Sequence, residues 1–360
     1  MLQTLTQKLS GLSYYAKLAL ALSAYQAVFI GCLEAFVFSK HVEIVSILTP
    51  NANATQYADE SESGEEYANA RSISVYHVLF IVAQFFQLGI YIDAIHNQNT
   101  IQIIALMLFE FGILIYSVIQ VYQSVQILKT IAEQINILPY EITIIVLIFI
   151  LANVFAYLAY KLYQEFGWSI YKKIGADMAM RDRYKMYQIF IMLLKFDLFF
   201  FVGLSVQILV LVIFIAKGQA DQSQQIAEHI IMSSVISTSM LMAAFLGVKK
   251  ENKLLMYLFM VGCVGTEVYF MIKLVDISTH PQKYLGTRIF ATFFVCICIL
   301  LGVVTLVISA LCLRNFDKGL KYHLSRDCNN ETEAEDQFPP GNNGFNLESV
   351  RGTIKRWSID

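Results

Sequence analysis

The stretch YKMYQIFIMLLKFDLFFFVGLSVQILVLVIFIA, residues 184–216, decides the fold. It places Lys195 and Asp197 in one of the most apolar parts of the chain. After Asp197, the nineteen residues 198–216 carry no charge. At 1.5 Å per residue, a helix of that length covers about 28 Å, nearly the whole hydrocarbon core of a bilayer. The stretch therefore predicts a membrane-spanning helix, with Lys195 and Asp197 at its cytosolic interface rather than as a pair buried in lipid.

The composition extends this prediction to the whole chain. Of the 360 residues, 57% are hydrophobic and 15% are charged, and the mean hydropathy is +0.56. Soluble domains carry about 25% charged residues, so a soluble fold would lack solvating charge. The net charge of −2 gives no electrostatic basis for binding nucleic acid. The six cysteines form no CxxC pair and show no zinc-ligand spacing, and we predict neither a metal site nor a cofactor.

Eight apolar segments are long enough to cross a bilayer, which predicts an all-α, polytopic transmembrane helical bundle. Their bounds are about 16–38, 73–94, 101–128, 140–163, 188–216, 229–248, 254–275 and 287–313. Segment 229–248 is the weakest because it is rich in hydroxyl and small side chains, and seven spans are the alternative. The bundle occupies residues 16–324, between a cytosolic N-terminus (1–15) and a disordered cytosolic tail (325–360).

The distribution of basic residues distinguishes between eight and seven spans. With eight spans and the N-terminus inside, the cytosolic segments hold 18 of the 26 Lys and Arg residues and the opposite side holds six. The positive-inside rule predicts this asymmetry. We therefore predict eight spans with both termini cytosolic. The loop 39–72 then faces the lumen, and Asn53, in the sequon Asn53-Ala54-Thr55, is a candidate N-glycosylation site.

Polar side chains inside the predicted spans are the candidate functional residues, because a charge in hydrocarbon is costly and usually faces a bundle interior. Glu110 is the deepest acid, and it fits either a functional carboxylate or a structural one that is hydrogen-bonded across helices. Glu267 lies past the middle of its span. Gln84 and Gln87 are three residues apart and share a helix face, which predicts a polar seam between helices.

Enzyme signatures are absent from the sequence. It contains no HExxH, GxSxG or Walker A motif, and no paired-cysteine metal motif. We therefore predict that the chain is not an enzyme and has no catalytic residues.

Two blocks of the sequence resemble a known family, the fungal family of uncharacterised Golgi apparatus multi-pass membrane proteins. The first block is FGWSIYKKIGAD (166–177) followed by YQIFIMLLKFDLFFFVGLSVQ (187–207), and the second is DAIHNQNTIQ (93–102) with Tyr116 and Gln120 downstream. The resemblance covers roughly residues 76–310. It implies a multi-pass protein of the Golgi apparatus membrane, and it implies no catalytic residues.

Three classes of function remain open. The first is a non-enzymatic Golgi membrane component, acting in trafficking or as a scaffold through cytosolic proteins that bind segment 161–187 and the tail. The second is a secondary transporter or channel, which predicts Glu110 and Glu267 in one water-filled cavity. The third is a membrane receptor with the acidic loop 39–72 as its sensor. The lipid bilayer is the one partner that all three share.

Overall fold

The computed structural model of the protein describes residues 12–53, 62–131, 137–174, 178–215, 235–280, 284 and 288–318. Within these residues the chain forms eight α-helices and no strand, so the predicted all-α fold class is confirmed. The helices are α2 (Tyr14–Asn53), α3 (Glu62–His96), α4 (Thr100–Ile131), α5 (Leu138–Ile174), α6 (Met178–Ile215), α8 (Ser237–Lys249), α9 (Lys253–Thr279) and α10 (Arg288–Arg314).

Seven of these helices are long and apolar enough to cross a membrane. The candidate spans are Tyr14–Glu43, Val75–His96, Thr100–Val125, Leu138–Gly167, Met178–Leu209, Lys253–Thr279 and Arg288–Arg314. They correspond to seven of the eight predicted spans. The remaining one, 229–248, lies partly outside the described residues, and its described part contains the 13-residue helix α8. The side of the membrane on which the termini lie, and the bounds of the cytosolic segments, stay predictions.

The helices extend beyond the predicted spans. α2 continues to Asn53 and α3 begins at Glu62, both inside the predicted loop 39–72. The predicted cytosolic segment 161–187 is also largely helical. Apolar composition shows where hydrocarbon begins and ends, whereas backbone hydrogen bonds can continue a helix into water. Glu and Ala, which favour helices, are frequent at the start of α3.

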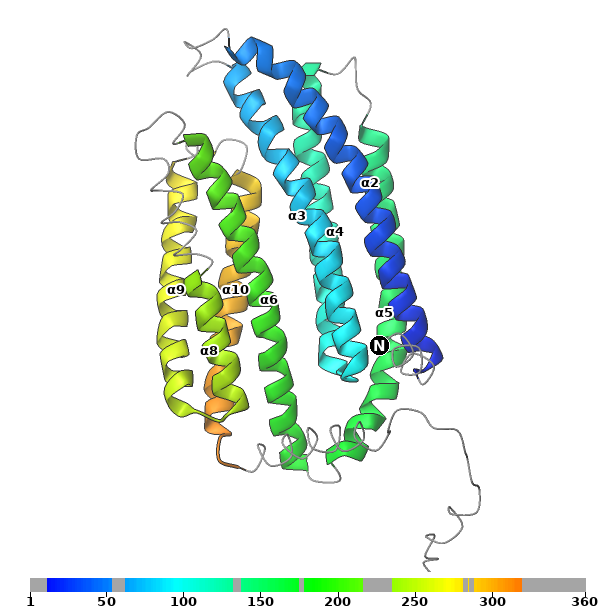
Figure 1. Cartoon of the computed structure of the whole chain (residues 1–360), viewed down its shortest axis with the longest axis vertical. Coiled ribbons are helices and arrows are strands. Elements are labelled where there is room, and N and C mark those ends of the chain that lie inside the picture. The colour runs from blue at the N-terminus through cyan, green and yellow to red at the C-terminus, as the bar shows by residue number, and fades with distance from the viewer. Residues whose placement is uncertain are drawn as a thin grey trace, which may run out of the picture. The chain divides into compact units, whose positions relative to one another are not determined.

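The helices alternate in direction along the chain and form two groups (Figure 1). In the N-terminal group, α2 packs on α3, α3 on α4, α4 on α5, and α5 on α2. In the C-terminal group, α6 packs on α8, α8 on α9, α9 on α10, and α10 on α6. α6 also contacts α3 and α4, which joins the two groups. α2 begins and α10 ends at the same end of the bundle (Figure 1).

A short turn joins α8 to α9 and reverses the chain. Glu251 has a φ of 52°, a left-handed conformation that ends α8. The Asn252 side chain then caps α9 by accepting hydrogen bonds from the amides of Leu254 and Leu255, at 3.0 and 3.4 Å. The charged sequence KKENK therefore forms a tight connection between two antiparallel helices.

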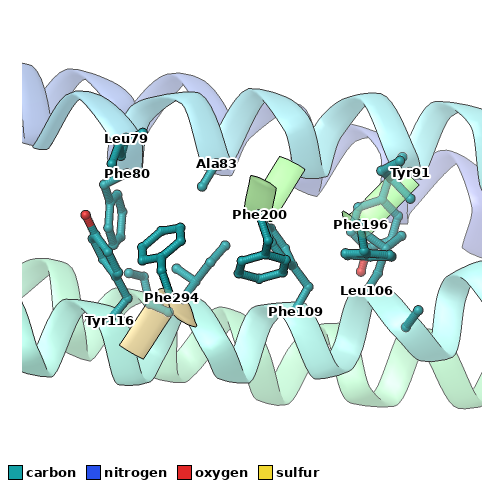
Figure 2. Close-up of a cluster of buried hydrophobic side chains, with 14 of the residues drawn as sticks. Leu79, Phe80, Ala83, Tyr91, Leu106, Phe109, Tyr116, Phe196, Phe200 and Phe294 are labelled. Atoms are coloured by element: carbon teal, nitrogen blue, oxygen red, sulfur yellow. The ribbon is translucent and has the colours of Figure 1, made fainter. Parts of the chain in front are cut away.

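Aromatic side chains fill much of the contact between the two groups (Figure 2). The rings of Phe109 in α4 and Phe196 in α6 lie 5.5 Å apart, and those of Phe200 in α6 and Phe294 in α10 lie 5.8 Å apart. Tyr116 in α4 also meets Phe294, at 6.0 Å. Aromatic rings at such spacings attract one another beyond the area they bury. The join between the groups is therefore made mainly by aromatic packing.

Candidate functional site

The deepest predicted acid, Glu110, is buried inside the N-terminal group. Its carboxylate accepts hydrogen bonds from Nε2 of Gln87 at 2.6 Å and from Nε2 of Gln26 at 3.0 Å. Nε2 of Gln26 also donates to Oε1 of Gln84 at 3.0 Å. All four side chains are at most 2% exposed. These residues, which we call the glutamine cluster, connect α2, α3 and α4 through polar side chains.

Three members of the glutamine cluster were candidates from the sequence. Gln84 and Gln87 were found by their spacing, and Glu110 by its depth. Gln26 was missed because a single Gln in an apolar segment does not reveal which neighbour it faces. Whether Glu110 has a functional or a structural role stays a prediction.

A second buried polar cluster lies at one end of the same helices. Nδ1 of His77 lies 2.6 Å from Oε2 of Glu34, and Nε2 of Gln120 donates to the same oxygen at 3.1 Å. The Gln120 amide also contacts the His77 ring. Glu34 and Gln120 therefore hold the His77 ring from the side of its Nδ1.

His41 of α2 packs on His77, with the ring centroids 4.7 Å apart. Nδ1 of His41 lies 3.1 Å from the carbonyl oxygen of Val37. Its Nε2 lies 3.2 Å from Oγ of Ser124 and 3.9 Å from Oε1 of Glu141. We call the following six residues the histidine cluster: Glu34, His41, His77, Gln120, Ser124 and Glu141.

The histidine cluster was not predicted from the sequence, in which its members lie in four separate segments. His41, His77, Ser124 and Glu141 each lie within a turn of the end of a candidate span. At such positions polar residues are common and attract no notice. The alternating helix directions bring these four ends together.

Lys195 and Asp197 of α6 face different helices. Nζ of Lys195 lies 2.5 Å from Oδ2 of Asp93 in α3, and Gln102 donates to the same oxygen at 2.8 Å. Asp197 is 2% exposed and accepts a hydrogen bond from Oγ1 of Thr305 in α10 at 2.7 Å. A spacing of two residues turns side chains about 200° around a helix, which explains this division. Their predicted position at the cytosolic interface stays a prediction.

Glu267 of α9 lies apart from Glu110. Its carboxylate lies against Gly302 of α10, where an added Cβ would be 1.8 Å from Oε1. This oxygen is buried and has no hydrogen-bond partner among the described residues. The two acids therefore face separate packed interfaces, one in each helix group.

Glycosylation at Asn53 stays a prediction. Asn53 is the last residue of α2, and Ala54 and Thr55 lie outside the described residues.

An apolar groove of about 520 Å³ lies between the two helix groups. Aliphatic and aromatic side chains of α3, α4, α6 and α10 line it, and Figure 2 shows several of them. Tyr116 supplies the only hydroxyl among the lining residues, and it donates to the carbonyl oxygen of Tyr76 at 2.9 Å. Leu108 and Leu300, which also line the groove, are 70% and 65% exposed. In a spanning helix such exposed apolar side chains face lipid, so the groove opens towards the bilayer.

The seven apolar helices and the buried polar clusters between them define a helical multi-pass membrane protein. The chain is 28% identical, over 283 aligned residues, to a UPF0658 Golgi apparatus membrane protein of Schizosaccharomyces pombe. The alignment covers 69% of this chain and 78% of the relative. It confirms the predicted resemblance to fungal Golgi membrane proteins and, with the apolar helices, the predicted multi-pass location in that membrane. No family model and no solved structure matches the chain.

Proposed function

We propose that the protein is a non-enzymatic component of the Golgi membrane that acts in trafficking or as a scaffold, and that it holds a lipid acyl chain. The observation that carries this proposal is the apolar groove between the two helix groups. Helices α3, α4, α6 and α10 contribute its walls, and all four contain candidate membrane spans. The groove therefore lies where lipid tails are the surrounding solvent.

The chemistry of the groove favours a chain without polar groups. Its volume of about 520 Å³ falls in the ordinary range of small-molecule sites. The Tyr116 hydroxyl already has a carbonyl partner, so a polar ligand would find no free hydroxyl among the lining residues. Burying an unpaired polar group is costly, whereas an acyl chain has none to bury. Because Leu108 and Leu300 are exposed, lipid tails can enter sideways from the bilayer.

The same lining supports a binding role rather than catalysis. Catalytic sites bring a nucleophile, a base and charge-stabilising donors together around one reacting atom. The residues that line the groove include no acid, base or amide. The described polar clusters, in contrast, are enclosed between helices and are nearly inaccessible.

The positions of Glu110 and Glu267 do not support the alternative of a transporter or channel. That function requires Glu110 and Glu267 to share a water-filled cavity, and their contacts instead place them in separate helix groups. For the receptor alternative, residues 54–61 of the sensor loop lie outside the described residues. Cytosolic trafficking proteins remain the proposed partners of segment 161–187 and of the tail.

The test uses the full chain in lipid nanodiscs that contain a phospholipid with a photoreactive acyl chain. After illumination, mass spectrometry should find the label on peptides of α4 and α10. Gly112 lines the groove, and a Cβ added there would meet no atom within 4 Å. Gly112→Phe should therefore fill the groove without a backbone clash and reduce labelling of these peptides at least fivefold.

Gly89→Phe is the matched control. A Cβ at Gly89 also meets nothing within 4 Å, but Gly89 does not line the groove, so labelling should stay as in the wild type. In cells that lack the native protein, the Gly89 variant should restore secretory transport and the Gly112 variant should not. Equal labelling of both variants would overturn the lipid site. Recovery of a chemically altered lipid would overturn the non-enzymatic assignment.

A further inference from the structure

Three buried side chains of the histidine cluster are arranged as metal ligands. One ring nitrogen of His41, one of His77 and one carboxylate oxygen of Glu141 all lie within 4.8 Å of one another. They come from α2, α3 and α5, and each side chain is at most 2% exposed. We propose that these residues bind a single divalent transition-metal ion such as Zn²⁺. This site does not depend on the lipid groove.

The neighbours of the two histidines orient the rings for such a role. Nδ1 of His77 is held by Glu34 at 2.6 Å, and Nδ1 of His41 lies 3.1 Å from the carbonyl oxygen of Val37. Each ring has its Nδ1 engaged, so we assign Nε2 as the ligand atom, which in His41 faces Oγ of Ser124 at 3.2 Å and Oε1 of Glu141 at 3.9 Å. Metal-binding histidines usually donate their other N–H to a carboxylate or a backbone carbonyl in this way. Gln120 holds Glu34 in place through a further hydrogen bond of 3.1 Å.

The charges of the cluster also call for a cation. Glu34 and Glu141 are two carboxylates, each 2% exposed, between membrane-spanning helices. Among the described residues, the basic groups within 4 Å of them are His77 and His41. Ionised carboxylates are expensive to bury unless they are paired or coordinate a metal. One divalent ion would neutralise both carboxylates and leave the two histidines neutral.

Glu141 is the second, independent indication of a ligand. Neither of its oxygens accepts a well-formed hydrogen bond from a described residue, although the carboxylate is buried. The Ser124 hydroxyl lies nearby, and its own contact is with Nε2 of His41 at 3.2 Å. An unpaired buried acceptor costs roughly 1–3 kcal/mol, and coordination to a cation would remove that cost.

The ligand types select the metal. Imidazole nitrogens favour zinc and similar transition metals, whereas calcium and magnesium prefer oxygen ligands only. Zinc binds nitrogen and carboxylate oxygen at about 2.0–2.2 Å, so in a tetrahedral site two of its ligand atoms lie roughly 3.4 Å apart. The three ligand atoms now lie within 4.8 Å of one another, so the side chains would close by about 1 Å as the ion binds. Water or the Ser124 hydroxyl would complete a tetrahedral site, which would tie three helices together at one end of the bundle.

The test measures zinc binding by the full-length protein, purified in detergent with an affinity tag that contains no histidine. After treatment with a chelator, Zn²⁺ is added back and the excess is removed by gel filtration. Elemental analysis should find one zinc per chain. His41→Gln and Glu141→Gln should each weaken binding at least tenfold. Glu34→Gln removes no ligand but should still weaken binding by roughly 10–100-fold, as loss of a histidine's carboxylate partner does.

His280→Gln is the matched control, because His280 also pairs with a carboxylate, Asp276, at 3.0 Å, but its side chain is 66% exposed. It should bind zinc as the wild type does. X-ray absorption at the zinc edge, on the wild type alone, should show two imidazole ligands and so does not depend on the folding of any variant. The proposal fails if the wild type binds no zinc, if its zinc has only oxygen ligands, or if His41→Gln leaves the affinity unchanged.

Discussion

The N-terminal and C-terminal helix groups are held together by different means. In the N-terminal group, buried polar side chains of different helices bond to one another, as Gln26, Gln87 and Glu110 do. In the C-terminal group, helices approach closely at several glycines, although Gly265 of α9 has no such neighbour. A Cβ would lie 2.7 Å from Phe294 at Gly203, 2.3 Å from Met240 at Gly262 and 1.8 Å from Glu267 at Gly302, whereas Gly31, Gly89 and Gly112 of the N-terminal group have no such neighbour within 4 Å.

This difference shows two solutions to one physical problem. Lipid tails are as apolar as leucine, so the hydrophobic effect does not drive helices together inside a bilayer. Association must come from hydrogen bonds between polar side chains or from close van der Waals packing at small residues. The N-terminal group uses mainly hydrogen bonds between polar side chains, and the C-terminal group uses mainly close packing at small residues. The buried donors and acceptors that could serve a bound ion are accordingly concentrated in the N-terminal group.

The largest effect is expected from Glu110→Leu. This change removes an acceptor from both Gln26 and Gln87, and it leaves the Gln87 amide unpaired inside the bundle, whereas Gln26 keeps its bond to Gln84. We expect the free energy of unfolding to fall by about 2 kcal/mol, measured by titration with a denaturing detergent. Glu110→Gln keeps an acceptor oxygen and should cost less than about 1 kcal/mol.

Glu267→Leu tests the C-terminal group, in which hydrogen bonds between side chains are expected to matter less. Oε1 of Glu267 is buried without a hydrogen-bond partner among the described residues, so its loss should be neutral or stabilising. If both leucine variants lose the same stability, the two groups do not differ in the way described above.

An effect of similar size is expected from Gly203→Ala. The new methyl group would lie 2.7 Å from a ring carbon of Phe294, and a packed ring cannot easily withdraw. Overpacking of this kind costs roughly 1–3 kcal/mol. The same change at Gly89 should be neutral or stabilise by up to about 1 kcal/mol, because alanine favours helix and nothing lies within 4 Å of the added Cβ. Detergent titration of both variants, and of Gly203→Ala with Phe294→Leu to restore space, measures this difference. A Gly203 variant as stable as the Gly89 variant would contradict close packing at this position.

The sequence predicted the membrane helices well because their signal is local. A run such as residues 198–216 must span a bilayer whatever its neighbours are. Glu110 was likewise visible by its depth within one segment. The partners of a polar residue are not local, and Gln26 and Glu110 are joined over 84 positions of sequence. His41 and Glu141 meet only because α2 and α5 are adjacent, which no spacing rule reveals.

A small effect is expected where the two helix groups meet, at the ion pair between Lys195 of α6 and Asp93 of α3. The side chains are 31% and 37% exposed, and exposed pairs contribute about 0.2–1 kcal/mol. Lys195→Met should therefore cost less than about 1 kcal/mol, and raised salt should reduce the loss, because ions screen exposed charges. Detergent titration at low and high salt measures the loss of stability and its dependence on salt.

The control is Lys185→Met. The partner of Lys185, Asp182, lies 3.9 Å away in the same helix, so this ion pair does not connect the two helix groups and its loss should cost less. A loss above about 2 kcal/mol that does not depend on salt would mean that a desolvated charge pair holds the groups together. The aromatic contacts of Phe109, Phe196 and Phe200 would then be secondary, whereas a small loss that varies with salt leaves them as the main join.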